Sequence, residues 1–355
     1  MANGKRVTIT SIAQNLELSV ATVSYVMNGK VEQNGIPEKT AERVRNEAKR
    51  LGYVPNDLAR SLRRQKTGSI GILLSDLQQG WAERLIKGVL SVLDQKEYVP
   101  YMTIHFWDPA REIRELESMV KRRMEAIITV PMIENADFYN AINRQGIPVV
   151  FIQDELVQCP DVSFCMWDAR EAAKAGVRHL LATGRKKIGF VGVQHFTPWL
   201  EMRLEGYKEA LRQAGAEMNS NWICLDKREA IALGSEVESH FGESLEKMLK
   251  NTPKDDLPDA FLTMNDAVAM TALHVIKDRL GYTVPGDFAV VGMGDLAFAP
   301  LVELTTAREP VEEVGRQAAR TALRLIDSET SGQMRTLVTN EDIIIRRSSG
   351  PLVVA

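Results

Sequence analysis

The 355-residue sequence predicts an α/β protein in which a small all-helical head precedes two doubly wound lobes built on parallel sheets. Two observations carry this prediction. Apolar residues recur at helical spacing over residues 9–51, and continuous apolar runs alternate with helical stretches over 68–345. Continuous apolar runs are typical of strands that are covered on both faces of a parallel sheet. The length also fits two or three domains at roughly 150 residues each.

Composition and charge exclude several classes of protein. The chain is 45% hydrophobic and 26% charged, which is typical of globular proteins and not of disordered or collagen-like ones. The apolar runs are shorter than the roughly 18 residues of a membrane-spanning helix, and the N-terminus lacks a signal-peptide core. We therefore expect a cytoplasmic protein without a membrane partner. Three cysteines without metal-site spacing predict neither a disulfide framework nor a bound metal, and we expect no cofactor.

Positive charge is concentrated near the N-terminus. Residues 1–66 contain twelve Lys and Arg against six Asp and Glu, a net charge of +6, whereas the whole chain carries -3. A basic module on an acidic body favours nucleic-acid binding. A solvated charged face would have the same composition, so the charge alone leaves both interpretations open.

The first two predicted helices form a pair. Thr8 can cap a helix over residues 9–16, and Ser19 can cap a second helix over 20–28. The short connection at residues 17–18 forces the two helices to cross steeply, which is the geometry of a helix-turn-helix.

A third amphipathic helix is predicted over residues 38–51, and Gly52 ends it. With the first two helices it would share one small apolar core. Helical spacing alone is also compatible with any small helical bundle.

The body alternates strands and helices. Strands are predicted at 69–74, 98–104, 126–130, 148–152, 187–193, 260–263 and 288–291, and helices at 81–95, 109–121, 137–145, 200–214 and 267–280. Open parallel sheets hold ligands beyond the carboxyl ends of their strands, so a cleft between two lobes is the expected ligand site. The sequence has no nucleophile elbow, P-loop or metal-spaced histidines, so we predict no enzyme.

Particular residues of the head resemble LacI/GalR-type transcriptional regulators, the lactose and purine repressor family. The matching segments are Val7-Thr8-Ile9, Leu18-Ser19-Val20-Ala21-Thr22-Val23-Ser24, Val26-Met27-Asn28-Gly29, Leu51-Gly52-Tyr53-Val54-Pro55-Asn56 and Ala59-Arg60-Ser61-Leu62. The body is similar to the effector-binding core of the same regulators, which has a periplasmic-binding-protein type of fold. The matching segments there include Arg203-Leu204-Glu205-Gly206-Tyr207, Asn265-Asp266 and Val284-Pro285-Gly286-Asp287.

The resemblance implies a ligand-responsive transcriptional regulator, most simply a repressor, that binds a palindromic double-stranded DNA operator as a homodimer. The implied domains are a helix-turn-helix domain at 1–54, a hinge helix and linker at 55–67, a two-lobed effector-binding and dimerisation domain at 68–345 and a tail at 346–355. The implied lobes are an N-lobe of about 68–164 and 307–327 and a C-lobe of about 165–306 and 328–345. The alternatives are a solute-binding protein and a doubly wound enzyme without a DNA role.

The resemblance also assigns DNA contacts. The implied base readers are Val20, Ala21 and Tyr25, and the implied phosphate contacts are Ser19, Thr22, Ser24 and Asn28. The implied minor-groove contacts of the hinge are Ala59, Arg60, Leu62 and Arg63, with Leu62 as the wedge. Two residues depart from the family pattern. Glu17 stands at the usual turn glycine, and Tyr25 stands where many members have an arginine, so base reading should be less directed to guanine.

The effector site is the remaining assignment. The implied effector-binding residues are Trp81, Gln153, Trp199, Arg203, Asn265, Asp266 and Asp295. Gln153 and Gly294 stand where family carboxylates accept sugar hydroxyls, whereas Arg203 is retained. We therefore expect an anionic effector such as a sugar acid, because a guanidinium binds a carboxylate through two hydrogen bonds. The operator, the effector and the sign of the response stay open at this point.

Overall fold

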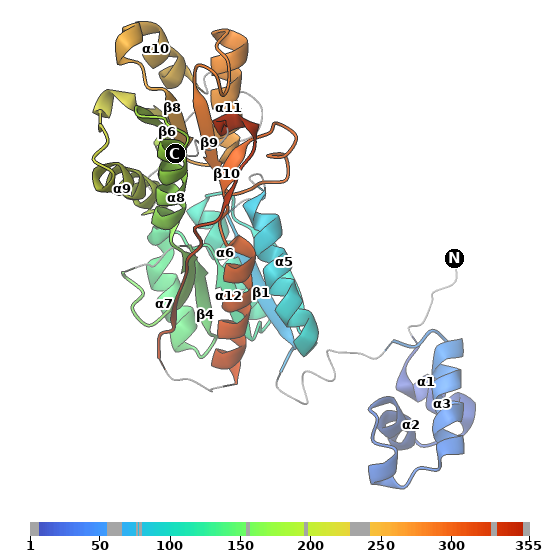
Figure 1. The fold of residues 1–355 in the computed structure, drawn as a ribbon. Coiled ribbons are helices and arrows are strands. Elements are labelled where there is room, and N and C mark those ends of the chain that lie inside the picture. The colour runs from blue at the N-terminus through green and yellow to red at the C-terminus, as the bar shows by residue number, and fades with distance from the viewer. Residues whose placement is uncertain are drawn as a thin grey trace, which may run out of the picture. The chain divides into compact units, whose positions relative to one another are not determined.

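The computed structural model describes residues 7–54, 66–75, 77, 80–153, 157–194, 198–227, 242–327 and 332–350 (Figure 1). The chain divides into two compact units, a head within residues 1–67 and a body within 68–355. Within the described ranges, no helix is both long enough and apolar enough to cross a membrane.

The head is the predicted bundle of three helices. They are α1 (Ile9–Leu16), α2 (Val20–Met27) and α3 (Glu38–Arg50). The hydroxyl of Thr8 accepts a hydrogen bond from the Ser11 amide at 3.2 Å and caps α1. The shared core consists of Ile12, Ala13, Val23, Val26, Val31, Ala41, Val44 and Ala48. Burial of this apolar stripe stabilises three helices that would each be marginal in isolation.

The N-lobe of the body is a six-stranded sheet with helices on both faces. Its elements are β1 (Ser69–Leu74), α5 (Trp81–Leu93), β2 (Val99–Ile104), α6 (Pro109–Lys121), β3 (Ala126–Thr129), α7 (Ala136–Arg144), β4 (Val149–Ile152), β5 (Ser163–Trp167), α12 (Val311–Ile326) and β11 (Arg335–Val338). The strand order is β11-β5-β4-β3-β1-β2, and every pair is parallel. The predicted strands of this lobe are thus confirmed as parallel strands; β1, β3 and β4 are buried, whereas β2 at the edge of the sheet is partly exposed.

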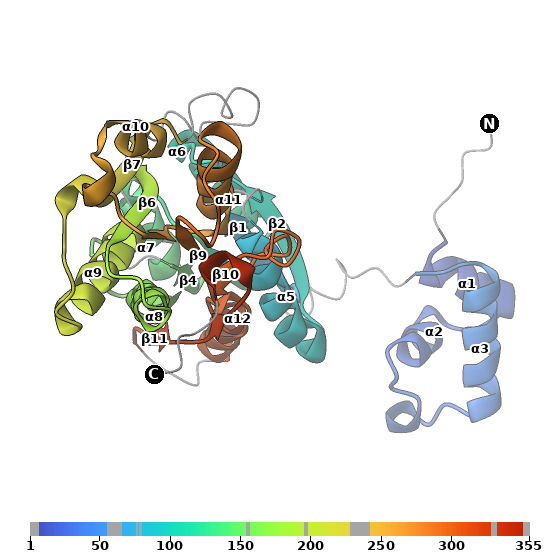
Figure 2. The same cartoon turned by 45° about the horizontal axis from the view of Figure 1, so that its top comes forward.

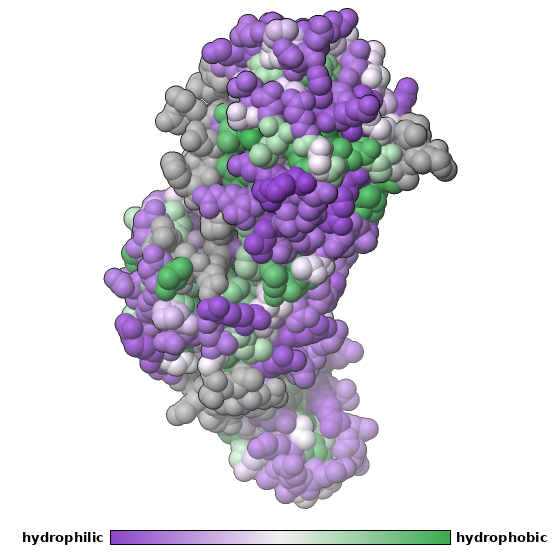
Figure 3. All heavy atoms as spheres, turned by 60° about the vertical axis from the view of Figure 1, so that its left-hand side comes forward, coloured by the Kyte–Doolittle hydropathy of each residue, from purple (hydrophilic) through white to green (hydrophobic). Residues whose placement is uncertain are grey.

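The C-lobe repeats this design. Its elements are α8 (Ala169–Ala182), β6 (Ile188–Gln194), α9 (Pro198–Gln213), β7 (Ile223–Lys227), α10 (Glu243–Asn251), β8 (Ala260–Thr263), α11 (Asp266–His274), β9 (Ala289–Met293), β10 (Thr305–Ala307) and β12 (Ile343–Ile344). The strand order is β12-β10-β9-β8-β6-β7, with β12 antiparallel to β10. In the view of Figure 3 the surface is mostly hydrophilic with smaller apolar patches, as expected when apolar strands are buried.

The lobe boundaries differ from the expected ones. The chain crosses between the lobes after β5, after β10 and after β11. The third crossing was expected near residue 327, but Arg335–Val338 pairs with β5 in the N-lobe, so the chain crosses only after Val338. The alternating burial of β11 on this edge of the sheet gives it no continuous apolar run, which is why the sequence pattern missed it.

The expected tail begins with an anchored segment. The hydroxyl of Ser348 donates to the Val290 carbonyl at 2.6 Å, and the hydroxyl of Ser349 lies 2.8 Å from Nε2 of His179. Both serines are buried, so residues 346–350 belong to the C-lobe. Two small polar residues give no hydropathy signal, so this anchor was not predicted.

Helices α5 and α12 lie side by side along the N-lobe sheet (Figures 1 and 2). Their contact depends on two glycines. A Cβ atom on Gly88 would overlap the carbonyl oxygen of Glu312, and one on Gly315 would overlap that of Leu85. The two backbones therefore touch at this crossing, which fixes α12 against a helix more than two hundred residues earlier in the chain.

Replacing Gly315 with Ala should destabilise the body. In an open helix this change stabilises by up to about 1 kcal/mol. Here the added methyl group overlaps the Leu85 carbonyl oxygen, and overpacking costs about 1 to 3 kcal/mol. Calorimetry of the full chain should show a lower unfolding temperature for the body. Arg324→Ala, an exposed change on the same helix, is the control. An unchanged or higher temperature for Gly315→Ala would contradict the close crossing.

Candidate functional site

The outer face of α2 carries the three predicted base readers. Val23 and Val26 are buried in the core of the head, whereas the three predicted readers are exposed. Val20 is 42% exposed and Tyr25 is 40% exposed, and Ala21 is exposed as well. Two large apolar side chains on a short helix are therefore available at the surface of the head.

The predicted phosphate contacts lie at the two ends of α2. At the N-terminal end, the Ser19 hydroxyl accepts a hydrogen bond from the Thr22 amide at 3.0 Å and lies 2.8 Å from the Thr22 hydroxyl. At the other end, the Asn28 side-chain amide donates to the Ser24 carbonyl at 2.6 Å. A capping hydroxyl keeps its own hydrogen for a further acceptor, and a helix N-terminus favours an anion such as a phosphate.

Part of the positive charge of the head is neutralised locally. Arg45 pairs with Glu38 at 2.6 Å, and Arg50 pairs with Glu47 at 2.7 Å. The Arg50 hydrogen bonds lower the pKa of Glu47 to about 2. Other cations are exposed and make no ion pair with a described residue; they are Lys30, Lys39, Arg43 and Lys49. The predicted hinge contacts lie outside the described residues; they are Ala59, Arg60, Leu62 and Arg63.

Glu17 occupies the turn between α1 and α2 in a strained conformation. Its φ and ψ are 56° and 41°, in the left-handed region that favours glycine. Its amide reaches back to the carbonyls of Ala13 and Gln14 and ends α1. Glu17, which replaces the usual turn glycine of the family, therefore keeps the backbone conformation that favours glycine.

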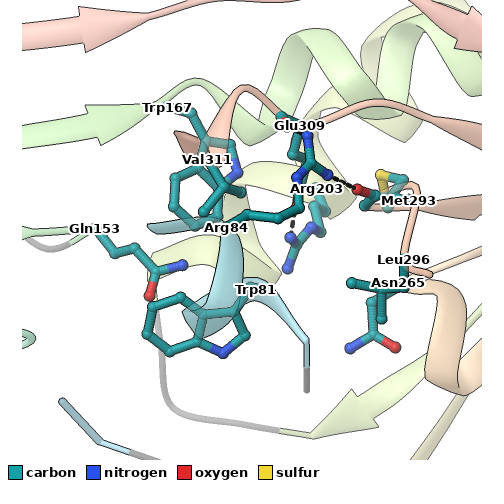
Figure 4. Close-up of a pocket in the computed structure, with 11 residues that line it drawn as sticks. Trp81, Arg84, Gln153, Trp167, Arg203, Asn265, Met293, Leu296, Glu309 and Val311 are labelled. Carbon is teal, nitrogen blue, oxygen red and sulfur yellow. Dashed lines mark hydrogen bonds and ion pairs between the residues drawn. The ribbon is translucent and has the colours of Figure 1, made fainter. Parts of the chain in front are cut away.

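A cleft lies between the two lobes of the body (Figure 4). Its lining residues are Trp81, Arg84, Gln153, Trp167, Arg203, Asn265, Met293, Gly294, Leu296, Glu309 and Val311. Gln153 follows β4, Trp167 ends β5, and Gly294 follows β9. The cleft is therefore at the carboxyl ends of the strands, where parallel sheets place ligands.

Four of the seven predicted effector residues line this cleft; they are Trp81, Gln153, Arg203 and Asn265. Asn265 also caps α11, since its side-chain oxygen accepts from the Val268 amide at 2.8 Å. The side chain of Trp199 lies outside the described residues.

The other two predicted residues are directed into the C-lobe. Asp266 accepts hydrogen bonds from the Thr306 hydroxyl at 2.6 Å and the Leu296 amide at 2.7 Å, and burial raises its pKa to about 6. Asp295 accepts from Arg308 at 2.9 Å and from Arg346 at 3.0 Å. These bonds tie both carboxylates to the C-lobe, and neither residue is among those that line the cleft, so their assignment to the effector site stays a prediction.

Three buried polar atoms in the cleft wall have no hydrogen-bond partner among the described residues. They are Oε1 of Gln153, Nε1 of Trp167 and Nε of Arg203. The three side chains are 7%, 5% and 3% exposed. Native proteins rarely leave buried polar atoms unpaired, so this wall is suited to a ligand that offers two acceptors and one donor. The indole rings of Trp81 and Trp167 and the apolar Val311 supply the flat, apolar part of the surface.

An ion pair and a second arginine change the expected charge of the cleft. Nη2 of Arg203 lies 2.5 Å from the carboxylate of Glu309, so a carboxylate that the sequence analysis did not consider pairs with the retained arginine. Arg84 donates to the carbonyl oxygens of Gly294 at 2.5 Å and Glu309 at 3.1 Å. Two arginines against one glutamate leave the lining with a net positive charge. Arg84, Trp167 and Glu309 were all missed, because no motif in the sequence marks them.

Family models match both the head and the body of the chain. Residues 8–56 match the family of bacterial regulatory proteins named after lacI, and residues 177–349 match the periplasmic binding protein-like domain. The NTD biosynthesis operon regulator NtdR of Bacillus subtilis (strain 168) is 29% identical over 349 residues, covering 96% of this chain and 99% of that protein. Catabolite control protein A of Priestia megaterium is 26% identical over 329 residues, covering 91% and 94%.

Solved structures show the same fold. A lac repressor dimer bound to operator and the anti-inducer ONPF superposes with a TM-score of 0.80 at 21% identity, covering 98% of this chain and 100% of that one.

Replacing Glu17 with Gly should stabilise the head. A residue with a Cβ atom in the left-handed region costs roughly 1 to 2 kcal/mol, and glycine avoids most of that cost. Amide hydrogen exchange in the full chain should be slower in α1 and α2, because the free energy of opening of the head rises by about 1 kcal/mol. Glu17→Ala removes the same carboxylate but keeps the Cβ atom, and it should give no such gain. Equal protection in the two variants would contradict the strain.

Proposed function

This chain belongs to the lacI family of bacterial regulatory proteins, and it is a ligand-responsive transcriptional regulator and not an enzyme. We propose that it binds a palindromic operator as a homodimer in the cytoplasm. We propose further that a small anionic molecule in the cleft controls this binding. The observation that carries the proposal is one chain with both an exposed helix-turn-helix surface and a cleft walled by unpartnered polar atoms. The alternatives, a solute-binding protein and a doubly wound enzyme, account for the body alone.

On the DNA side, α2 is proposed as the helix that enters the major groove. The exposed side chains of Val20 and Ala21 can contact thymine methyl groups, and the Tyr25 hydroxyl can donate to or accept from a base edge. Ser19 and Asn28, at the two ends of α2, would contact the flanking phosphates. The proposed minor-groove contacts of the hinge, with Leu62 as a wedge, rest on the family resemblance.

The small size of the reading surface supports the proposed homodimer. One α2 of eight residues spans only a few base pairs, so two heads related by a two-fold axis are needed to read a longer, palindromic site. NtdR, which aligns along nearly the whole chain, is named as the regulator of an operon. An operator near an operon is therefore the first site to examine.

For the effector, a sugar acid or a similar carbohydrate anion is the proposed class. The two indole rings suit a flat, partly apolar ring, and the orphaned donors on Trp167 and Arg203 suit acceptor oxygens. The positive charge comes from two arginines, of which Arg203 already binds Glu309. A carboxylate ligand would therefore meet Nε of Arg203 and the half-buried Arg84 together.

Replacing Tyr25 with Ala should weaken binding to the cognate operator by about 1 to 3 kcal/mol and relax base preference at one position of each half-site. Tyr25→Phe keeps the ring and removes only the hydroxyl, so it separates hydrogen bonding from apolar contact. Gel shifts against a panel of single-base operator variants measure both. An operator preference that is unchanged in Tyr25→Ala would remove this residue from the set of readers.

Sugar acids or sugar phosphates, and not neutral sugars, should raise the unfolding temperature of the body in a thermal-shift screen. Arg203→Ala should abolish the shift, because it removes a donor and leaves Glu309 unpaired in the cleft wall. Arg212→Ala on the same helix α9 is exposed and should keep the shift. Stabilisation by neutral sugars alone would contradict the anionic class while leaving the cleft as the effector site.

A further inference from the structure

The side chain of Arg84 bridges the two lobes. It starts on α5 of the N-lobe and donates to the carbonyl oxygen of Gly294, which directly follows β9 of the C-lobe (Figure 4). Its second guanidinium nitrogen donates to the carbonyl oxygen of Glu309, in the crossover between β10 and α12. One planar cation therefore holds carbonyl groups from the far lobe and from the crossover at the same time.

The two arginines of the cleft have different partners. Arg203 is paired with the carboxylate of Glu309 at 2.5 Å, whereas Arg84 makes no ion pair within the described part of the chain. Among the described residues, the positive charge of Arg84 is therefore balanced by the dipoles of two carbonyl groups. A hydrogen bond from a charged donor is about twice as strong as a neutral one, so this bond is a sizeable tie between lobes that share few backbone connections.

The base of Arg84 is fixed within the N-lobe. Helix α5 touches α12 at the Gly88 and Gly315 crossing, and α12 begins two residues after Glu309. Lys87 adds a pairing to Glu312 at 3.1 Å across the same two helices. Arg84 and Glu309 thus move as one body, and the Gly294 carbonyl is the partner that belongs to the other lobe. Arg203 on α9 of the C-lobe also pairs with Glu309, so separation of the lobes must break both this ion pair and the bond of Arg84 to Gly294.

We propose that Arg84 is an interlobe latch that keeps the cleft closed when no effector is bound. An effector that offers an acceptor to Arg84 would replace the Gly294 carbonyl, so one side chain couples occupancy of the cleft to the arrangement of the lobes. This regulatory meaning rests on the proposed function. The latch itself does not, because it concerns the protein without effector or DNA.

The experiment measures the distance between the lobes in the full chain without ligand. The three native cysteines are buried, so nitroxide labels can be attached to introduced cysteines at two exposed sites, Gln145→Cys in the N-lobe and Gln213→Cys in the C-lobe. Pulsed electron spin resonance then gives the distribution of label separations. Arg84→Met, which keeps the aliphatic stem but has no donor, should broaden this distribution and lower the ratio of closed to open molecules roughly tenfold.

Two further variants make the result decisive. Lys87→Met lies on the next turn of α5 and removes a cation that pairs only within the N-lobe, so it should keep the wild-type distribution. Arg84→Gln is too short to reach across and should behave like Arg84→Met, which provides a second test if one variant folds poorly. The latch would be overturned if a folded Arg84 variant and the wild-type protein gave the same distribution of label separations, whether narrow or broad. Neither outcome depends on the operator or the effector, so the proposed function would stand.

Discussion

The close crossing of α5 and α12 is the constraint on which the body depends. Two glycines remove the side chains that would hold the helices apart, and the backbones of segments far apart in sequence come into contact. The crossing sets where α12 begins, and so where Glu309 lies. The position of Glu309 in turn fixes the buried guanidinium of Arg203 in the cleft wall. A close backbone packing contact thereby positions the charges of the cleft.

Two kinds of buried polar group occur in this body, and they differ in how fully they are paired. The Glu112 carboxylate, deep in the N-lobe, accepts from the hydroxyl of Tyr139 at 2.5 Å, the side chain of Asn135 at 2.6 Å and the amide of Met132 at 3.0 Å. Burial nevertheless raises its pKa to about 7. The cleft wall has polar atoms that are just as buried but unpaired. The satisfied group ties elements together, and the unsatisfied ones are available to a ligand.

Hydropathy patterns predicted the three head helices and the buried parallel strands, because these elements repeat a burial period over many residues. The same patterns missed β11, whose burial alternates, and the buried serines near residue 348. For the cleft, the family resemblance named Arg203, which lines it, and Asp266 and Asp295, which are not among the lining residues. Each is adjacent in sequence to a residue that lines the cleft, but Asp266 begins α11 and Asp295 lies in the turn after β9, and both side chains are hydrogen-bonded within the C-lobe. Arg84 and Glu309 meet only through tertiary packing, which no local pattern records.

The anchoring of residues 346–350 has a genetic consequence. Ser348 and Ser349 fill hydrogen bonds to Val290, Thr305 and His179 that no other segment described for this lobe provides. A premature stop codon just before these residues would leave those groups unpaired inside the C-lobe, where each orphaned polar group costs about 1 to 3 kcal/mol. Nonsense and frameshift alleles that remove these residues would then behave as folding mutants that lose the effector response, and not as harmless truncations.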